Sequence, residues 1–514
     1  MSVFRDVLLS AIAAGGPATA VVDDLCSVSY DLLDGWSTTV AQETVAPCTS
    51  ADSDACVALL LPNGAAWTAS WLAVLKTGLI AAPLNTTLTD VEVGRVLELS
   101  RPQLLLTGPE RTDDLADLCA TLRLPTLVRA VLPVAQPAQG LPGSFTVSGR
   151  HRPGGPCLLM HTSGTTGAPR PVVQTEQALL LAAGHWRRQH RTADDVVAVP
   201  VPQSHTYGHL ATASTLLAGA TLLLSGYPFD PDRWTHAMAR NRATVVEAVP
   251  AVYGRLLTSL SVVPDATAVL RRCLSAGQSA PAALRDQWEQ ATGVALWESW
   301  GMTELAGPGL GPVDGQICPG SAGLPVPGLE VRVVAGQEAV PDTGADADAD
   351  CAPSADGATG ELWVRGPQVT PGVRMRPGHI DPVTDEAGWL RTGDLARRDA
   401  HGCVTLVGRT KDVIVTNGYT VYPAEVEEAL CGHPAVAAAA AIPRQDPERG
   451  EVVHAVVVRH FGTDLTADDL ITHCRTLLAR YKTPRSVHFT PALPLSATGK
   501  LDRAALRTLA AQIH

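Results

Sequence analysis

GWLRTGDLARRDAHGCVTLVGRTKDVIVTNGYTVYPAEVE, residues 388–427, contains a change from one pattern of strands to another. The apolar run Val404–Val407 predicts a strand, and a second apolar run follows the charged GRTKD turn. Because this turn follows one strand and precedes a new one, as a hinge would, we place a domain boundary at Arg409–Lys411. The boundary divides the chain into an N-terminal domain, residues 1–408, and a C-terminal domain, residues 409–514.

Upstream of this stretch, short apolar runs alternate with helical patterns. Val57–Leu61 and Ile80–Leu84 flank a helical pattern at Ala65–Lys76, and the alternation continues as far as Val245–Val249. Continuous apolar strands between helices predict parallel sheets that are covered on both faces. From about Gly328 onward, strands joined by Pro and Gly turns predict a barrel-like subdomain instead.

The end of the chain has the pattern of a small α+β module, with predicted helices at Pro423–Leu430 and Ala467–Arg480. The predicted class is therefore α/β: a large N-terminal domain with stacked parallel sheets and a barrel-like β subdomain, plus a small mobile α+β C-terminal domain. The acidic, low-complexity segment Asp342–Gly357 predicts a solvated loop at a hairpin tip.

Composition narrows the possible classes of function. The chain has 514 residues, of which 46% are hydrophobic and 18% charged, so it can bury a large core and is not a disordered chain. Its formal net charge of −12 disfavours nucleic acid and anionic membrane surfaces as partners. By inspection, no stretch reaches the ~18 apolar residues of a membrane span.

The 11 cysteines contain no C-x-x-C pair and no metal-ligand spacing, which predicts reduced, mostly buried thiols in a cytoplasmic protein. Residues 7–13 followed by Ala18-Thr19-Ala20 imitate a signal peptide, but Asp6 cancels the charge of Arg5 and a Gly-Gly-Pro step breaks the apolar run early. A short helix leading into a strand is the interpretation that we favour.

A Ser/Thr/Gly-rich segment, TSGTTGAPR at 162–170, follows the apolar strand Cys157–Met160. Glycines let a backbone fold tightly around phosphate oxygens, and hydroxyls and amides donate hydrogen bonds to them. The spacing is not that of a Walker P-loop. On its own, the segment could equally be an ordinary turn.

Four motifs, in this order along the chain, carry a resemblance to a known family: TSGTTG, WESWGMTE at 297–304, TGD with GRTKD at 392–412, and TGK ending at Lys500. Together they resemble the adenylate-forming superfamily, which includes acyl-CoA synthetases, aryl and fatty acid ligases, luciferases and adenylation domains of peptide synthesis. Two departures stand in the phosphate loop, where Arg170 replaces the usual lysine and Pro171 the usual glycine.

The resemblance implies a site for ATP and Mg²⁺. Trp300 would place its ring against the adenine, Thr303 would contact the α-phosphate, and Glu304 would be the ligand of Mg²⁺, which typically needs only one or two carboxylates beside substrate phosphates. Asp394 and Arg409 would hold the ribose and phosphate, although a turn cap and an ion pair with Glu361 are structural alternatives. The residues expected to bind the nucleotide are Thr162, Ser163, Gly164, Thr165, Thr166, Gly167, Arg170, Gly277, Gln278, Ser279, Glu298, Ser299, Trp300, Gly301, Asp394 and Arg409.

The resemblance also implies how the acid is bound and activated. Lys500 would neutralise charge that develops as the carboxylate attacks ATP, and His205 would gate the carboxylate. Thr206 stands where amino-acid-activating relatives carry an Asp, so an α-amino acid is not the expected substrate. Glu247 could bind a polar substrate group, but a salt bridge within the protein is the favoured alternative. The residues expected in the acyl pocket are His205, Thr206, Tyr207, Gly208, Glu247, Gly301 and Met302, and the expected catalytic residues are Lys500, Thr303, Glu304 and His205.

The predicted function is ATP- and Mg²⁺-dependent activation of a carboxylic acid as an acyl-adenylate, with release of pyrophosphate. Rotation at the hinge residue Lys411 would then admit a thiol past Gly418, from CoA or from the phosphopantetheine of an acyl carrier protein. A luciferase-like oxygenase and a non-catalytic nucleotide-binding scaffold remain as alternatives. Expected partners are the small acid, ATP and the thiol, without nucleic acid or membrane.

Overall fold

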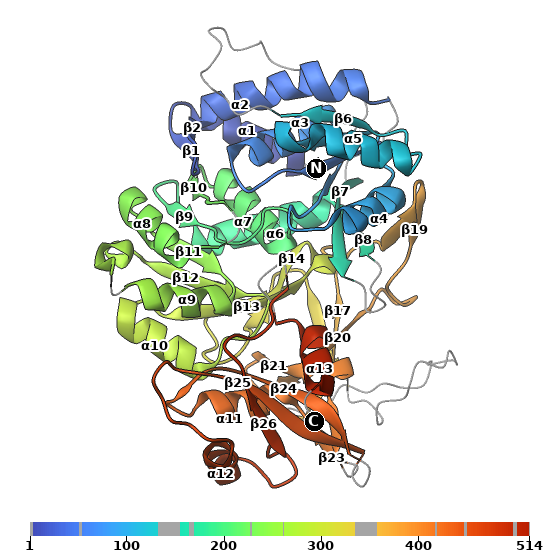
Figure 1. Cartoon of the computed structure of the whole chain (residues 1–514). Coiled ribbons are helices and arrows are strands. Elements are labelled where there is room, and N and C mark those ends of the chain that lie inside the picture. Colours follow the sequence, from blue (N-terminus) through green and yellow to red (C-terminus); the bar gives the residue numbers. More distant parts are fainter. Residues whose placement is uncertain are drawn as a thin grey trace.

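The computed structural model describes residues 4–50, 54–131, 155–163, 169–226, 229–260, 262–334, 357–416, 419–446, 450–496 and 501–512. It confirms the predicted class: large α/β sheets in the N-terminal part and a smaller sheet domain at the C-terminal end, at the bottom of Figure 1. The predicted strands Glu330–Val334 and Gly360–Arg365 are found with the same boundaries.

A nine-stranded sheet has the order β15-β14-β13-β12-β11-β9-β10-β1-β2. Its strands from β13 to β1 are parallel, and β14, β15 and β2 join antiparallel. The strand bounds are β1 Thr19–Val22, β2 Ser27–Ser29, β9 Val196–Ala198, β10 Thr221–Leu223, β11 Val245–Ala248, β12 Arg272–Ala276, β13 Leu296–Met302, β14 Gly307–Gly311 and β15 Leu324–Pro325.

A second, eight-stranded sheet has the order β19-β18-β8-β7-β4-β3-β5-β6. Its strands from β7 to β6 are parallel, whereas β8 pairs antiparallel with β7 across the phosphate-loop segment. The strand bounds are β3 Cys56–Leu60, β4 Ile80–Pro83, β5 Leu104–Thr107, β6 Leu127–Ala130, β7 Pro156–Ser163, β8 Pro169–Thr175, β18 Val373–Arg376 and β19 His379–Asp381.

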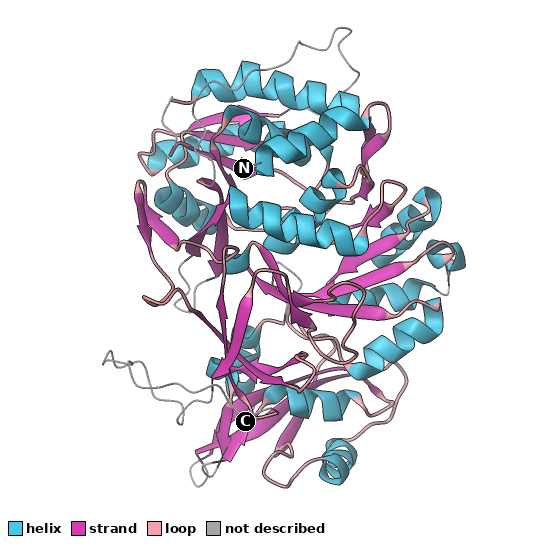
Figure 2. Ribbon diagram, turned by 180° about the vertical axis from the view of Figure 1, so that it is seen from behind, coloured by secondary structure: helices cyan, strands magenta, loops and turns pink. Residues whose placement is uncertain are grey.

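Helices surround these two sheets, as the view from behind shows (Figure 2). Helices α3 and α7 are buried along nearly their whole length, which requires apolar residues on every face rather than on one stripe. The helices of this part are α1 Phe4–Gly15, α2 Tyr30–Thr39, α3 Ala65–Thr77, α4 Asp90–Ser100, α5 Thr112–Thr121, α6 Glu176–His190, α7 Thr206–Leu217, α8 Pro231–Asn241, α9 Pro250–Leu260 and α10 Ala282–Thr292.

The β subdomain is an antiparallel sheet of β16 Glu330–Val334, β17 Gly360–Arg365, β20 Leu390–Arg398 and β21 Val404–Arg409. Its core is shared with β13 and β14, because Trp300 and Leu310 pack in the same cluster as Leu362 and Val404. The acidic segment 342–356 lies outside the described residues.

A short 3₁₀ turn, Thr410–Asp412, joins β21 to the C-terminal sheet. That sheet comprises β22 Ile414–Thr416, β23 Tyr419–Val421, β24 Val436–Asp446, β25 Gly450–Arg459 and β26 Ser486–Phe489, and it is accompanied by α11 Pro423–Cys431, α12 Ala467–Leu477 and α13 Arg503–Gln512. Helix α12 ends three residues earlier than predicted, where Leu478 turns to extended backbone. The turn lies at the predicted domain boundary, which stays a prediction.

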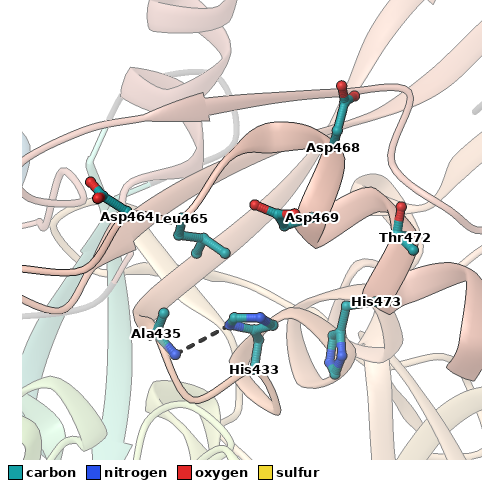
Figure 3. A pocket seen from close by; sticks show the side chains of 8 residues that line it. All are labelled: His433, Ala435, Asp464, Leu465, Asp468, Asp469, Thr472 and His473. Atoms are coloured by element: carbon teal, nitrogen blue, oxygen red, sulfur yellow. Dashed lines mark hydrogen bonds between the residues drawn. The ribbon is translucent and has the colours of Figure 1, made fainter.

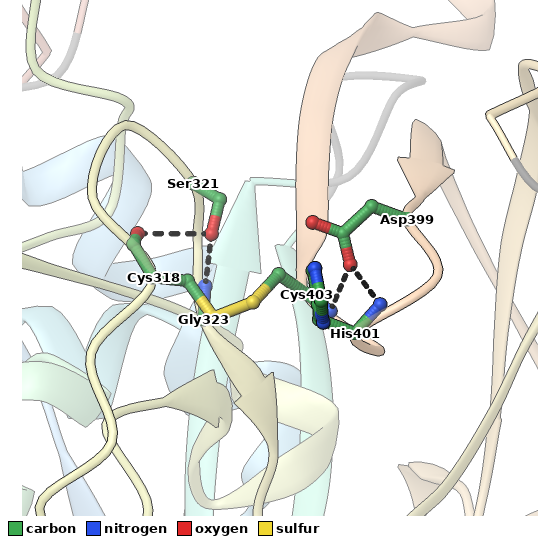
Figure 4. Close-up of a disulfide and its surroundings, with 6 residues drawn as sticks. All are labelled: Cys318, Ser321, Gly323, Asp399, His401 and Cys403. Atoms are coloured by element: carbon green, nitrogen blue, oxygen red, sulfur yellow. Dashed lines mark hydrogen bonds between the residues drawn. A yellow bond between two sulfur atoms is a disulfide. The ribbon is translucent and has the colours of Figure 1, made fainter.

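The cysteine prediction was wrong in one respect. Cys318 and Cys403 form a disulfide with a Cα–Cα distance of 6.1 Å, although they are 85 residues apart (Figure 4). The disulfide joins the loop before β15 to the turn between β20 and β21, where Asp399 accepts hydrogen bonds from the backbone of His401 and Cys403. Pairing across such a separation leaves no spacing signal in the sequence. The free cysteines in the described residues are Cys26, Cys48, Cys56, Cys119, Cys157, Cys273, Cys431 and Cys474, of which five are buried.

Within the described ranges, no helix combines the length and apolar character that a membrane crossing needs.

Candidate active site

Thr303 lies at the junction of three segments that are distant in sequence. It begins the short turn after β13, and its hydroxyl accepts a hydrogen bond from the Thr206 hydroxyl, 3.1 Å away, at the start of α7. The Gln174 side chain on β8 donates to the Thr303 carbonyl at 2.9 Å, and the Thr370 amide donates to the Glu304 carbonyl at 2.7 Å. The predicted phosphate and acyl residues are therefore in direct contact.

The Glu304 carboxylate lies near two predicted nucleotide residues. Burial raises its pKa, while the charges of Arg170 and Arg409 act in the opposite direction. In the described part of the chain, this carboxylate accepts a hydrogen bond from the backbone of Glu304 itself and none from a side chain, so it keeps acceptor positions for a cation. Hard oxygen donors of this kind suit Mg²⁺. No three His, Cys, Asp or Glu side chains of the described residues converge on one point as a closed metal cage would need.

Asp394 and Arg409 face each other across β20 and β21. Arg409 Nε lies 2.8 Å from Asp394 Oδ1, and Trp300 Nε1 donates to Asp394 Oδ2 at 2.8 Å. The alternative pairing of Arg409 with Glu361 is wrong, because Glu361 binds Arg391 instead. The three predicted nucleotide residues thus form one group, joined by a hydrogen bond and an ion pair.

Glu298 supports the turn that contains the predicted nucleotide residues Gly277, Gln278 and Ser279. Its carboxylate accepts the Ala280 amide at 3.0 Å and pairs with Arg285 at 2.7 Å, and burial raises its pKa. Gly277 begins this turn with φ +88°, a backbone conformation that residues other than glycine rarely adopt. Gln278 and Ser279 follow it in the same turn.

Some predicted residues turn out to have internal partners. The Ser299 hydroxyl donates to the Leu310 carbonyl on β14 at 2.7 Å. Gly301 lies so close to the same strand that a Cβ there would stand 2.2 Å from the Gly307 oxygen. Gly208 is similarly tight, because a Cβ would stand 2.1 Å from the Pro202 oxygen. At these three positions, the Ser299 hydroxyl and the lack of a side chain at Gly301 and Gly208 therefore serve contacts within the protein.

Glu247, one of the predicted acyl-pocket residues, belongs to a buried polar group. Glu247 on β11 pairs with Arg191 at 2.5 Å, both side chains being fully buried, and Trp186 Nε1 donates to both carboxylate oxygens. Tyr207 packs in the main core and donates its hydroxyl to the Leu274 carbonyl at 3.1 Å. The favoured salt bridge of Glu247 is confirmed, and its alternative role toward a substrate is not supported. Arg191 and Trp186 gave no sequence signal, because nothing local links them to β11.

His205 caps α7, where its Nδ1 accepts the Tyr207 amide at 3.3 Å, and Met302 is partly buried against the β-subdomain core. Thr162 and Arg170 are cross-strand neighbours at the mouth of the β7–β8 hairpin, with Ser163 ending β7. The residues Gly164, Thr165, Thr166, Gly167, Gly418 and Lys500 lie outside the described residues.

A pocket of about 510 Å³ lies elsewhere, in the C-terminal domain beside α12 (Figure 3). The His433 and His473 rings meet edge to face there, 5.1 Å apart, near Asp464, Asp468 and Asp469. None of the predicted site residues that the structure describes lines this pocket, so the pocket is separate from the group around Thr303.

The comparisons with known proteins agree with this geometry. The AMP-binding enzyme family model matches residues 11–373, and the model of the AMP-binding enzyme C-terminal domain matches residues 425–500. The chain belongs to this family. It is therefore an acid–thiol ligase of the adenylate-forming superfamily, which activates a carboxylic acid as its adenylate.

Two relatives are similar to the enzyme over most of their length. A sulfoacetate–CoA ligase of Cupriavidus necator is 32% identical over 456 residues, covering 87% of this chain and 86% of the relative. A feruloyl-CoA synthase of an Amycolatopsis species is 33% identical over 466 residues, covering 88% of each. Among solved structures, ATP-bound MatB from Rhodopseudomonas palustris aligns with a TM-score of 0.83 at 28% identity, over 98% of both chains.

Proposed function

We propose that the enzyme joins an acyl or aryl carboxylic acid, without an α-ammonium group, to the thiol of CoA through an acyl-adenylate. The two relatives are named for joining sulfoacetate or a feruloyl group to CoA, which supports CoA as acceptor. Transfer to the phosphopantetheine of a carrier protein is the alternative acceptor. Both acceptors present the same thiol chemistry, so they differ only in what surrounds the thiol.

The observation that supports this substrate class is the lack of an available carboxylate among the residues of the predicted acyl pocket. All seven of its residues lie in the described part of the chain, and Glu247 is the only one with a carboxylate. Because both Glu247 oxygens are engaged by Arg191 and Trp186, no pocket carboxylate is left to balance an α-ammonium group. A buried ammonium without a counter-charge is expensive. Thr206 offers only a hydroxyl, already bonded to Thr303.

In the first step, the substrate carboxylate attacks the α-phosphorus of ATP and pyrophosphate leaves. Thr303 would hold the α-phosphate beside Thr206, and Asp394 with Arg409 would hold the ribose. Glu304 would carry Mg²⁺, which would neutralise phosphate charge. Lys500 would stabilise the charge that develops on the attacking carboxylate and α-phosphate. In the second step, the thiol would reach the adenylate past Gly418 and AMP would leave.

A pyrophosphate-release screen across aliphatic, aromatic and α-amino acids, run with and without CoA, tests the proposal. We expect turnover of acids without an α-ammonium group, and a thioester product only when CoA is present. Thioester formation on a phosphopantetheinylated carrier protein but not on CoA would change the acceptor. Robust turnover of a standard α-amino acid that Glu247→Gln abolishes would overturn the substrate class.

The role of Glu304 is tested with Glu304→Gln, which keeps the shape but removes the charge. Adenylation at saturating Mg²⁺ should fall by about 10²-fold, the usual loss when one electrostatic contact of the transition state is removed. Glu98→Gln, on the exposed face of α4, is the matched control and should be silent. Unchanged adenylation and unchanged Mg²⁺ dependence in Glu304→Gln would remove this residue from the metal site.

A further inference from the structure

The Trp300 side chain is locked in place and aims its indole N–H at Asp394. The residue is only 7% exposed, and its ring packs in the β-subdomain core with Leu305 and Leu310. Gly309 makes room for it, since a Cβ there would stand 2.7 Å from Trp300 Cζ3. Because these neighbours enclose the ring, the ring cannot rotate away from Asp394. Its Nε1 lies 2.8 Å from Asp394 Oδ2.

Asp394 has a different kind of partner on its other oxygen. Arg409 Nε lies 2.8 Å from Oδ1, and its side chain is 50% exposed. Arg409 also directly precedes the turn Thr410–Asp412 at the predicted hinge. On one oxygen, the carboxylate thus accepts a hydrogen bond from a buried donor of β13, and on the other it forms an ion pair with a half-exposed guanidinium. The bond from Trp300 does not depend on the hinge.

The carboxylate still has capacity for a ligand. An ionised carboxyl group accepts about four hydrogen bonds, two on each oxygen. The Trp300 N–H occupies one position on Oδ2, and Arg409 forms an ion pair with Oδ1, so each oxygen keeps at least one lone pair. The Asp394 amide is satisfied separately, by donating to the Thr392 hydroxyl at 3.0 Å. Two neighbouring hydroxyls, one per oxygen, would complete the site.

We propose that Trp300 is a positioning residue for the ribose: its indole N–H fixes the rotation of the Asp394 carboxylate so that a lone pair on each oxygen meets one of the two ribose hydroxyls. This rests on the proposed nucleotide site. It gives Trp300 a task distinct from contact with the adenine, because it acts through its edge and through another residue. Trp300→Phe keeps an aromatic face and deletes the donor, so it separates the two tasks.

The experiment compares ATP, 2′-deoxy-ATP and 3′-deoxy-ATP in acid-dependent pyrophosphate release. The wild type should prefer ATP over both analogues. Trp300→Phe should lower kcat/KM for ATP about tenfold, the size expected for a lost hydrogen bond to a charged group. This loss in kcat/KM should appear mainly as a higher KM for ATP. With at least one of the two deoxy analogues, Trp300→Phe should cause a much smaller loss. Asp394→Asn should show the same pattern, and adding Trp300→Phe to it should cost little more, because coupled residues are not additive.

A site-specific benzothiophene analogue of tryptophan at position 300 is the second variant. It retains ring size and stacking but lacks the N–H, so it should reproduce Trp300→Phe even if that substitution impairs folding. Equal losses for ATP and both deoxy analogues, or an isostere that behaves as the wild type, would overturn the proposal. Failure of the proposed function is distinguishable, because the wild type would then show no acid- and ATP-dependent pyrophosphate release at all.

Discussion

Asp195 shows how one buried side chain joins strand ends that the sequence leaves far apart. It lies at the amino end of β9 and binds Thr244 before β11, at 2.7 Å, and Arg271 before β12. Burial pushes the pKa of this carboxyl upward, but the hydrogen bonds from Arg271, Thr244 and Thr192 outweigh it and lower the pKa to about 2. The ionised form is therefore favoured in the folded protein.

Asp195→Asn should destabilise the enzyme by about 2 kcal/mol at pH 7, as a pKa lowered from 3.8 to about 2 implies. This contribution is present above pH 3.8 and is lost as pH falls toward 2. Urea unfolding from pH 7 to pH 3 should thus show the two proteins converging on the acid side. The neighbouring, exposed Asp194→Asn is the control. A difference that stays constant over this range would contradict the linkage.

At the scale of elements, the Cys318–Cys403 disulfide ties the loop before β15 to the strand that leads toward the predicted hinge. Beside it, the Ala322 amide donates to the Val404 carbonyl and the Val404 amide donates to the Gly323 carbonyl, so the covalent link and the backbone pairing fix the same contact. Both ends belong to or adjoin the β-subdomain core.

Cys403→Ser should lower the free energy of unfolding by up to about 4 kcal/mol under oxidising conditions, because the open chain regains loop entropy over a long separation. Cys48→Ser removes a free cysteine and serves as control. Thermal unfolding with and without dithiothreitol provides the measurement: reductant should lower the Tm of the wild type and of Cys48→Ser but leave that of Cys403→Ser unchanged. A wild-type Tm that does not change with reductant would argue against the Cys318–Cys403 disulfide.

For the whole molecule, the predicted rotation at Lys411 would separate the two half-reactions. Asp412, next to it, is buried and binds Arg503 and Arg507 of α13, so the end of the chain is tied to the far side of the turn. A rotation at Lys411 would therefore carry Asp412 and α13 as one unit.

Lys411→Pro should leave adenylation intact and abolish thioester formation from the adenylate, because a fixed φ blocks the rotation that a hinge must make. Lys411→Ala removes the side chain without fixing φ and should support both steps. Single-turnover assays of pyrophosphate release and of thioester formation distinguish them. If Lys411→Pro completes both steps at the wild-type rate, the hinge lies elsewhere.

Lys500→Ala should have the opposite effect. Adenylation should fall by about 10²-fold or more, since a charge that stabilises the transition state is lost. A chemically supplied acyl-adenylate should still be converted to thioester at the wild-type rate. Loss of equal size in both half-reactions would show that the substitution acts on the fold rather than on the first step.

Local pattern was enough to predict several elements of this protein, because the periodicity of apolar residues is set by each helix or strand alone. Gly360–Arg365 was predicted with its boundaries, and Ala65–Lys76 is extended by one residue. The family motifs likewise identified Thr303, Glu304, Asp394 and Arg409 as a set, and the structure brings them together.

What only the tertiary structure decided is which side chains meet across long separations. Arg191 with Glu247, Trp300 with Asp394, and Cys318 with Cys403 are 56, 94 and 85 residues apart. Each pair depends on the order in which strands are placed in a sheet or on where a loop crosses a neighbouring strand. Such placement follows from the packing of whole layers, so no local spacing records it. The sequence by itself determined the class of enzyme, the class of its fold and several of the fold's elements, and the packing decided how each functional side chain is held.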